Sequence, residues 1–189
     1  MNIKFDAAYH LVLREAGELL ATLQEETVKN FLEKIQNEWP RRRLFFWARG
    51  RSFLMLKGFA MRLMHMGYEV HLVGEPDCPS IAEGDVFMIA SGSGGTASVL
   101  LFAQKAKEVG ASVVGVVGKQ QSKLAEIADF VIEFSPQDAP PTKQLSSGGG
   151  GTRFEHALMH FFDSVVLAMV YERREEAYQE MMVRHANLE

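Results

Sequence analysis

The chain has 189 residues, of which 47% are hydrophobic and 23% charged, and its formal net charge is −4. These values are typical of a single soluble globular domain, and the negative charge gives no general attraction to nucleic acid or to an anionic membrane. The single cysteine, Cys78, excludes an intramolecular disulfide and indicates a reducing compartment, so we expect a cytoplasmic protein. No apolar run is long enough to cross a bilayer.

Hydrophobic spacing predicts one long helix over about 5–38, which Pro40 ends. The basic run 41–43 then leads directly into an apolar segment, so we interpret it as the solvated start of a strand rather than as a nucleic-acid site. Strand-like and helix-like segments alternate from there to residue 134. The predicted strands are 44–48, 70–73, 86–90, 112–117 and 130–134, and the predicted helices between them are 52–66, 97–110 and 122–128.

The remainder of the chain contains a loop and a helix. Residues 135–151 are rich in Pro, Ser and Gly, which predicts either a flexible loop or a functional lid. A final long helix is predicted from residue 152 to about residue 184.

Strands that are apolar on both faces and alternate with helices predict a parallel sheet covered on both sides. We therefore expect an α/β fold, a three-layer αβα sandwich with a five-stranded parallel sheet, flanked by N- and C-terminal helices. The expected single domain consists of a helical segment 1–40, an α/β core 41–134, a flexible loop 135–151 and a C-terminal helix 152–189.

The segment from Ser91 to Thr96 follows a predicted strand and opens a predicted helix. The start of a helix offers free N–H groups and the positive end of the helix dipole, and glycines let the backbone approach an anion closely. Ser91, Ser93 and Thr96 add hydroxyl donors, so the loop suits the phosphate of a small phosphorylated molecule. Neither the P-loop nor the dinucleotide-binding pattern fits the segment. The alternative is an ordinary Gly/Ser turn.

Several segments, in order and spacing, resemble the sugar isomerase (SIS) domain family and, within it, the 6-phospho-3-hexuloisomerase subgroup. Ala-Met-Arg-Leu-Met-His at 60–65 and Gly-Thr-Arg-Phe-Glu at 151–155 are similar to the subgroup, and the Ser-Gly-Ser-Gly-x-Thr loop at 91–96 is similar to the broader family. The other matching pieces are 50–52, 73–75, 83–85, 122–125 and 162–163. The resemblance implies an enzyme that interconverts a 3-ketohexose 6-phosphate and fructose 6-phosphate through an enediol(ate), without a metal or an organic cofactor.

The same resemblance implies roles for individual residues. Glu155 corresponds to the proton-moving carboxylate, and His65 is expected as a second catalytic group that can reach a neighbouring subunit's pocket. The expected substrate- and phosphate-binding residues are Arg51, Ser52, Ser91, Ser93 and Thr96.

Structural roles compete with these catalytic ones. Ser52 also fits an ordinary helix N-cap, and Glu155 with Thr152 fits a capping box. His65 fits a satisfied core or surface histidine. His156, His160 and Asp163 can share one helix face at a spacing that can bind a metal, but no fourth ligand is in view, so we expect a polar face or a subunit contact.

Two positions depart from the subgroup pattern, because Arg49 and Gly95 stand where a small residue and a glutamate are usual. These departures keep two alternatives open: a non-catalytic module that senses a sugar phosphate, and another SIS isomerase of the phosphoheptose or arabinose-5-phosphate type. The terminal helices carry more apolar surface than a small sandwich covers, and SIS domains generally pair. We therefore expect a homodimer or homotetramer whose ligand is a phosphorylated sugar, with no nucleic-acid or membrane partner.

Overall fold

The structure is a computed structural model that describes residues 4–119, 121–134 and 152–188, with the side chain of residue 152 left out. The predicted loop over 135–151 lies outside the described residues.

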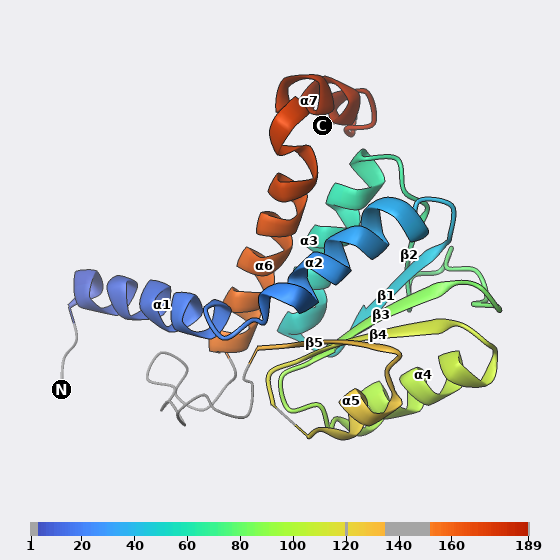
Figure 1. The fold of residues 1–189 in the computed structure, drawn as a ribbon, viewed down its shortest axis with the longest axis horizontal. Helices are drawn as coiled ribbons and strands as arrows, with labels where there is room; N and C mark the ends of the chain where they lie inside the picture. Colours follow the sequence, from blue (N-terminus) through green and yellow to red (C-terminus); the bar gives the residue numbers. More distant parts are fainter. Residues whose placement is uncertain (1–3, 120, 135–151, 189) are drawn as a thin grey trace.

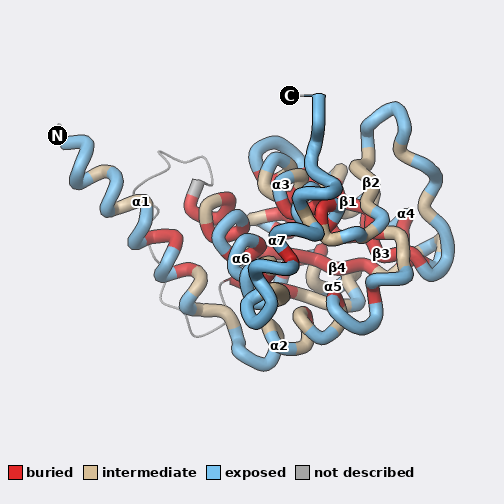
Figure 2. The backbone as a smooth tube through the Cα atoms, turned by 90° about the horizontal axis from the view of Figure 1, so that it is seen from above, coloured by how far each residue is buried: buried red, intermediate tan, exposed pale blue. Residues whose placement is uncertain are grey.

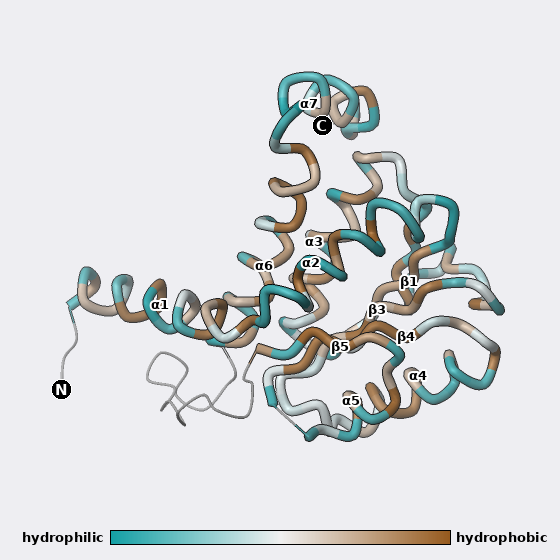
Figure 3. Tube along the Cα trace, in the orientation of Figure 1, coloured by the Kyte–Doolittle hydropathy of each residue, from teal (hydrophilic) through white to brown (hydrophobic). Residues whose placement is uncertain are grey.

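The described strands form one parallel sheet in the order β2-β1-β3-β4-β5. The predicted α/β fold is confirmed, and each strand ends within one residue of its expected end (Figure 1). The strands are brown in Figure 3 because they are apolar on both faces, as a sheet with two covered faces requires. Their bounds are β1 (Leu44–Ala48), β2 (Val70–Leu72), β3 (Val86–Ser91), β4 (Ser112–Val117) and β5 (Phe130–Glu133).

Helices cover both faces of the sheet (Figure 1). One hydrophobic cluster lies between the sheet and helices α2, α3 and α6, and a second lies between the sheet and helices α4 and α5. The bounds are α2 (Glu25–Glu33), α3 (Arg51–His65), α4 (Ala97–Glu108), α5 (Lys123–Ile127) and α6 (Thr152–Val170). Because all the strands are parallel, the loops that lead into α3, α4 and α5 lie along the same carboxyl edge of the sheet.

The N-terminal helix differs from the single helix expected over 5–38. It is divided into α1 (Phe5–Leu20), α2 and a π-helical turn η1 (Lys34–Glu38). The break comes at Thr22, whose hydroxyl donates to the carbonyl oxygens of Leu19, at 2.7 Å, and Phe134. A side chain that bonds to the backbone in this way competes with the helical pattern.

The expected C-terminal helix is also divided. After α6 comes a 3₁₀ turn, η2 (Tyr171–Arg173), and then α7 (Arg174–Val183), which turns across the end of α6 (Figure 1). Arg174 Nη1 donates to the Tyr171 carbonyl oxygen at 3.0 Å, so a side chain satisfies a backbone acceptor at the break. The prediction of one continuous helix was wrong at this point.

The first half of α1 projects away from the rest of the protein and is largely exposed (Figure 2). Phe5 is 87% exposed there, and large hydrophobic side chains are also exposed on α6 and α7, including Leu167 and Met182. Among the described residues, no helix is both long and apolar enough to cross a membrane.

Candidate active site

The candidate site lies at the carboxyl edge of the sheet, where β1 and β3 end side by side. Ala48 pairs with Ala90, so the short turn that leads into α3 lies next to the loop 91–96 that leads into α4. The backbone turns sharply between β1 and α3. Gly50, the residue before α3, has a φ of +63°, which favours glycine.

The three hydroxyls predicted to hold a phosphate are close together. Ser91 Oγ lies 3.2 Å from Thr96 Oγ1 and 3.5 Å from Ser93 Oγ. The Gly94 and Gly95 amides donate to the hydroxyls of Ser91 and Ser93 at 3.1 and 3.3 Å. Thr96 precedes α4 without capping it through its side chain, which leaves the first amides of α4 directed toward the same loop. Hydroxyls and a helix N-terminus thus occur together, as an anion site requires.

The loop is fixed from behind by the start of α5. Gly94 has a φ of +58°, and a Cβ built on it would lie only 2.2 Å from the Ser122 side chain. The Leu124 amide donates to the Gly94 carbonyl oxygen at 2.9 Å. Ser122 itself caps α5, because its hydroxyl accepts from the Ala125 amide at 3.3 Å. Any side chain at position 94 would displace this contact, so the glycine keeps the loop rigid.

Glu155, in the first turn of α6, is bonded to α3. Ser52 Oγ donates to Glu155 Oε1 at 3.1 Å, and both side chains are buried. Glu155 Oε2 is also buried but has no hydrogen-bond partner in the described part of the chain. A buried, unpaired carboxylate oxygen is costly, and such atoms in native proteins are often kept for chemistry.

This arrangement differs from the simple N-cap expected for Ser52. Gly50 is the N-cap of α3, and Ser52 lies inside the helix with its hydroxyl on Glu155 rather than on a backbone amide. The capping box of Glu155 with Thr152 involves a side chain outside the described part of the chain. The structure thus brings Ser52 and Glu155 together, although they are far apart in the sequence.

Arg51 and His156 stand beside this pair. Arg51 is exposed at the first position of α3, and His156 follows Glu155 on α6. Burial lowers the pKa of His156, and the nearby charges of Arg51 and His160 lower it further, whereas Glu155 raises it. His156 is therefore within electrostatic reach of both Arg51 and Glu155, a position that its sequence spacing did not predict.

His65 lies at the other end of α3. The thirteen residues from Ser52 to His65 span about 20 Å of helix, so one chain does not bring His65 to Glu155. Its ring is buried and stacks on His185 at a centroid distance of 5.1 Å, while Arg184 Nη1 donates to the His65 carbonyl oxygen at 3.3 Å. Burial lowers the pKa of His65, and the neighbouring His185 and Arg62 lower it further.

The two departures from the subgroup pattern lie at the rim of the site. Arg49 is exposed, directly after β1. A Cβ at Gly95 would meet nothing closer than the Ser93 carbonyl oxygen at 3.9 Å, so this position has room for a side chain. No three His, Cys, Asp or Glu residues of the described chain are arranged to hold a metal, and this includes His156, His160 and Asp163.

Residue-by-residue interpretation of the sequence missed two parts of the site. Phe154 packs against the backbones of Gly92 and Gly118, and Ser122 supports Gly94. The sequence did offer one indication for Gly118, because a glycine that directly follows the predicted strand 112–117 lies at the carboxyl edge of the sheet. The contact of both glycines with one phenylalanine was not visible, because these residues are distant in sequence.

Comparisons with known proteins show which family the chain resembles. The sequence model of the SIS domain family matches residues 39–148. The chain is 36% identical over 180 residues to the 3-hexulose-6-phosphate isomerase of Bacillus subtilis, covering 94% of this chain and 95% of that protein. It is 38% identical over 147 residues to the Methylomonas aminofaciens protein of the same name, covering 78% and 81% of the two chains.

Among solved structures, a hypothetical protein of Methanococcus jannaschii superposes with a TM-score of 0.78 at 30% identity, covering 96% of this chain and 98% of that one. A molecular function of 3-hexulose-6-phosphate isomerase was inferred for that protein. The matched fold, the hydroxyl loop at the carboxyl edge and the length of the similarity lead to one conclusion: this chain belongs to the SIS domain family.

Proposed function

We propose that the protein is a sugar-phosphate isomerase that interconverts 3-hexulose 6-phosphate and fructose 6-phosphate. The observation that carries the proposal is the Glu155 carboxylate, which is buried, held through one oxygen by Ser52 and unpaired at the other. It lies at the same sheet edge as the cluster of three hydroxyls at the start of α4. The two relatives described above, which align over 94% and 78% of the chain, are named for this activity.

The phosphate group of the substrate binds first in this mechanism. Ser91, Ser93 and Thr96 donate hydroxyl hydrogen bonds to it, and the amides at the start of α4 face its negative charge. Binding at a remote phosphate fixes the sugar carbons relative to the catalytic groups, which converts a bimolecular proton transfer into a nearly unimolecular one.

Glu155 then moves a proton between neighbouring carbons. Its free oxygen, Oε2, takes the proton from C2 of the 3-ketose, the electrons form the C2–C3 double bond of the enediol(ate), and the carbonyl oxygen at C3 becomes the oxygen of the intermediate. The proton then returns at C3 as the C2 carbonyl forms, and the proton that the C2 hydroxyl loses is balanced by the one that the C3 oxygen gains. Ser52 holds the other carboxylate oxygen and so fixes the direction of the free one. The Arg51 guanidinium, at the start of α3, stabilises the negative oxygen of the intermediate.

His65 acts in the site of a second copy of the chain in this proposal, because about 20 Å of α3 separates it from Ser52, the partner of Glu155 in the same chain. The exposed hydrophobic side chains on α1, α6 and α7 support a homodimer or homotetramer in which such sharing takes place. Light scattering tests the assembly directly, and a monomer at micromolar concentration would contradict it.

Proton exchange tests the proposed reaction. The protein is incubated with fructose 6-phosphate in heavy water and followed by NMR. We expect deuterium at the carbon next to the carbonyl, together with a new 3-ketose. Thermal stabilisation by the sugar phosphate without exchange would favour a non-catalytic sensor. Exchange with sedoheptulose 7-phosphate or arabinose 5-phosphate alone would favour a different SIS isomerase.

A further inference from the structure

The aromatic ring of Phe154 lies against two loop backbones at the carboxyl edge of the sheet. A Cβ built on Gly92 would lie 3.2 Å from ring atoms Cγ and Cδ1 of Phe154. A Cβ built on Gly118 would lie 2.8 Å from ring atom Cδ2 and 3.0 Å from the Gly92 carbonyl oxygen. The ring therefore fits only because both positions lack a side chain.

The two glycines belong to different loops. Gly92 is part of the hydroxyl loop that follows β3, and Gly118 directly follows β4. Phe154 precedes Glu155 in the first turn of α6, so the ring and the carboxylate share one rigid piece of helix backbone. The Phe154 ring also meets Phe134 in a T-shaped contact, at a centroid distance of 5.8 Å and an interplanar angle of 81°. Phe154 thus connects the hydroxyl loop to the residue that carries the carboxylate.

We infer that Phe154 is a positioning residue that sets the location of Glu155 relative to the bound phosphate, an inference that rests on the proposed function. The phosphate is held by the loop that contains Gly92, and the proton is moved by the residue next to Phe154. The contact between ring and loop fixes the span between the two ends of the substrate. A displacement of about 1 Å between a catalytic group and its substrate costs about 10²-fold in rate.

Phe161 offers a matched control for the aromatic ring. It lies on the same helix, is 3% exposed where Phe154 is 4% exposed, and also meets Phe134 edge-on, at 5.6 Å and 86°. It packs on Phe31 and Phe162 instead of on a loop of the site. Phe154→Leu and Phe161→Leu should therefore lower the melting temperature by similar amounts, because each removes a comparable buried ring.

The two variants should differ in turnover. We expect Phe154→Leu to lower kcat for fructose 6-phosphate about 10- to 100-fold while the Kd measured with the same sugar phosphate stays within about threefold. Phe161→Leu should leave kcat within about twofold of wild type. Equal kcat in the two variants, or a loss in Phe154→Leu that is confined to melting temperature or Kd, would overturn the inference.

A second pair of variants tests the glycine side of the contact. Gly118→Ala places a methyl group 2.8 Å from the ring and should lower kcat, whereas Gly58→Ala, at an exposed position on α3 with nothing within 4 Å of the new methyl group, should not. Combining Gly118→Ala with Phe154→Leu removes ring atoms that the new methyl group meets, so the double variant should lose less than the product of the two single losses. A loss equal to that product would overturn the coupling.

The failure of the inference is distinguishable from that of the proposed function. If the wild-type protein neither isomerises fructose 6-phosphate nor exchanges its protons, both are overturned. If the wild type is active and Phe154→Leu resembles Phe161→Leu, only the role of Phe154 is overturned.

Discussion

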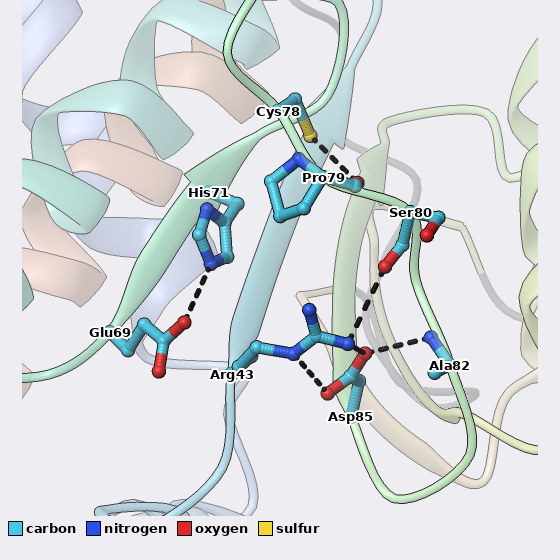
Figure 4. A network of polar contacts seen from close by, with 8 residues as sticks. All are labelled: Arg43, Glu69, His71, Cys78, Pro79, Ser80, Ala82 and Asp85. Carbon is cyan, nitrogen blue, oxygen red and sulfur yellow. Dashed lines mark hydrogen bonds and ion pairs between the residues drawn. The ribbon is translucent and has the colours of Figure 1, made fainter.

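The two edges of the sheet each hold a buried carboxylate, and the two are bonded in different ways. At the amino edge, Asp85 precedes β3 and faces Arg43, which precedes β1 (Figure 4). At the carboxyl edge, Glu155 faces Ser52. Both acids are buried, so burial alone does not distinguish a structural carboxylate from a reactive one.

Both oxygens of Asp85 have partners. Arg43 Nε donates to Oδ1 at 3.0 Å and Nη2 donates to Oδ2 at 2.6 Å, and the Ala82 amide adds a bond to Oδ2 at 2.8 Å. Arg43 also reaches the Ser80 carbonyl oxygen at 3.4 Å. The hydrogen bonds to Asp85 raise the pKa of the Arg43 guanidinium, so the guanidinium stays charged. This planar, two-bonded pairing ties the starts of two neighbouring strands together.

Glu155 has the opposite character, because Oε2 remains without a partner in the described chain. A carboxylate with both oxygens bonded, such as Asp85, is suited to holding strands in register, whereas one with an enclosed oxygen that has no partner can accept a proton from a ligand. The two carboxylates therefore differ in whether both oxygens have hydrogen-bond partners, and not in being acids or in being buried.

The largest expected effect comes from removing the charge at the carboxyl edge. Glu155→Gln keeps the shape and the acceptor for Ser52 but cannot take a proton, so turnover should fall about 10³- to 10⁴-fold. The Kd for fructose 6-phosphate should stay within about threefold, because the phosphate contacts are unchanged. Turnover and calorimetric binding measure the two quantities. Turnover equal to that of wild type would contradict the role of Glu155 as the base.

A smaller loss is expected from His65→Asn, about 10²-fold in turnover, if the histidine supplies a proton in a neighbouring site. Mixing this variant with Glu155→Gln tests whether two chains share a site. After subunit exchange, half of the random dimers contain one chain of each kind, and each such dimer has one intact site of two, so about a quarter of wild-type activity should return. Two impaired variants that fail to complement each other would place His65 outside a shared site.

Removing the charge at the amino edge should change stability and leave chemistry intact. Asp85→Asn loses the charged pairing with Arg43 and one acceptor for its guanidinium, so the melting temperature should fall by several degrees. Turnover per folded molecule should match the wild type, because the site is at the opposite edge. A fall in kcat comparable to that of Phe154→Leu would contradict this separation of roles.

The fold and the hydroxyl loop were predictable from the sequence because their signals are local. Apolar runs specify the strands, and the glycines and hydroxyls of 91–96 follow a strand directly. The breaks in the terminal helices were not predictable, since the Thr22 hydroxyl bonds to the Phe134 carbonyl oxygen, 112 residues away. The helical periodicity on either side of Thr22 does not indicate that its hydroxyl bonds to Phe134.

Long-range pairing also explains what was missed in the site. The bond between Ser52 and Glu155 joins residues 103 positions apart, and neither residue's local pattern distinguishes a partner from a helix cap. The run 41–43 does precede β1, and Arg41 is exposed, but the interpretation as a solvated strand start did not predict the pairing of Arg43 with Asp85. The role of each of these side chains depends on a partner that is distant in sequence and close only in the folded chain.

The smallest expected effect concerns His65, which α3 carries from the carboxyl edge toward the amino edge. Unlike Asp85, this buried group faces like charges: Arg62 on its own helix and His185 beyond α7, while Arg184 bonds to its carbonyl oxygen. Its pKa lies below the ordinary value of 6.5 in the folded protein. Between the lowered value and 6.5 the unfolded chain therefore binds a proton that the folded chain does not.

The sign of the pH dependence follows from that difference. The contribution of His65 is fully present above about pH 6.5 and decreases as the pH falls toward the lowered pKa, so stability rises with pH in this window. Melting temperatures at about pH 7.5 and 5.5 measure the effect. His65→Gln should lose less stability on acidification than wild type. An identical loss in wild type and His65→Gln would show that His65 does not titrate against its cationic neighbours.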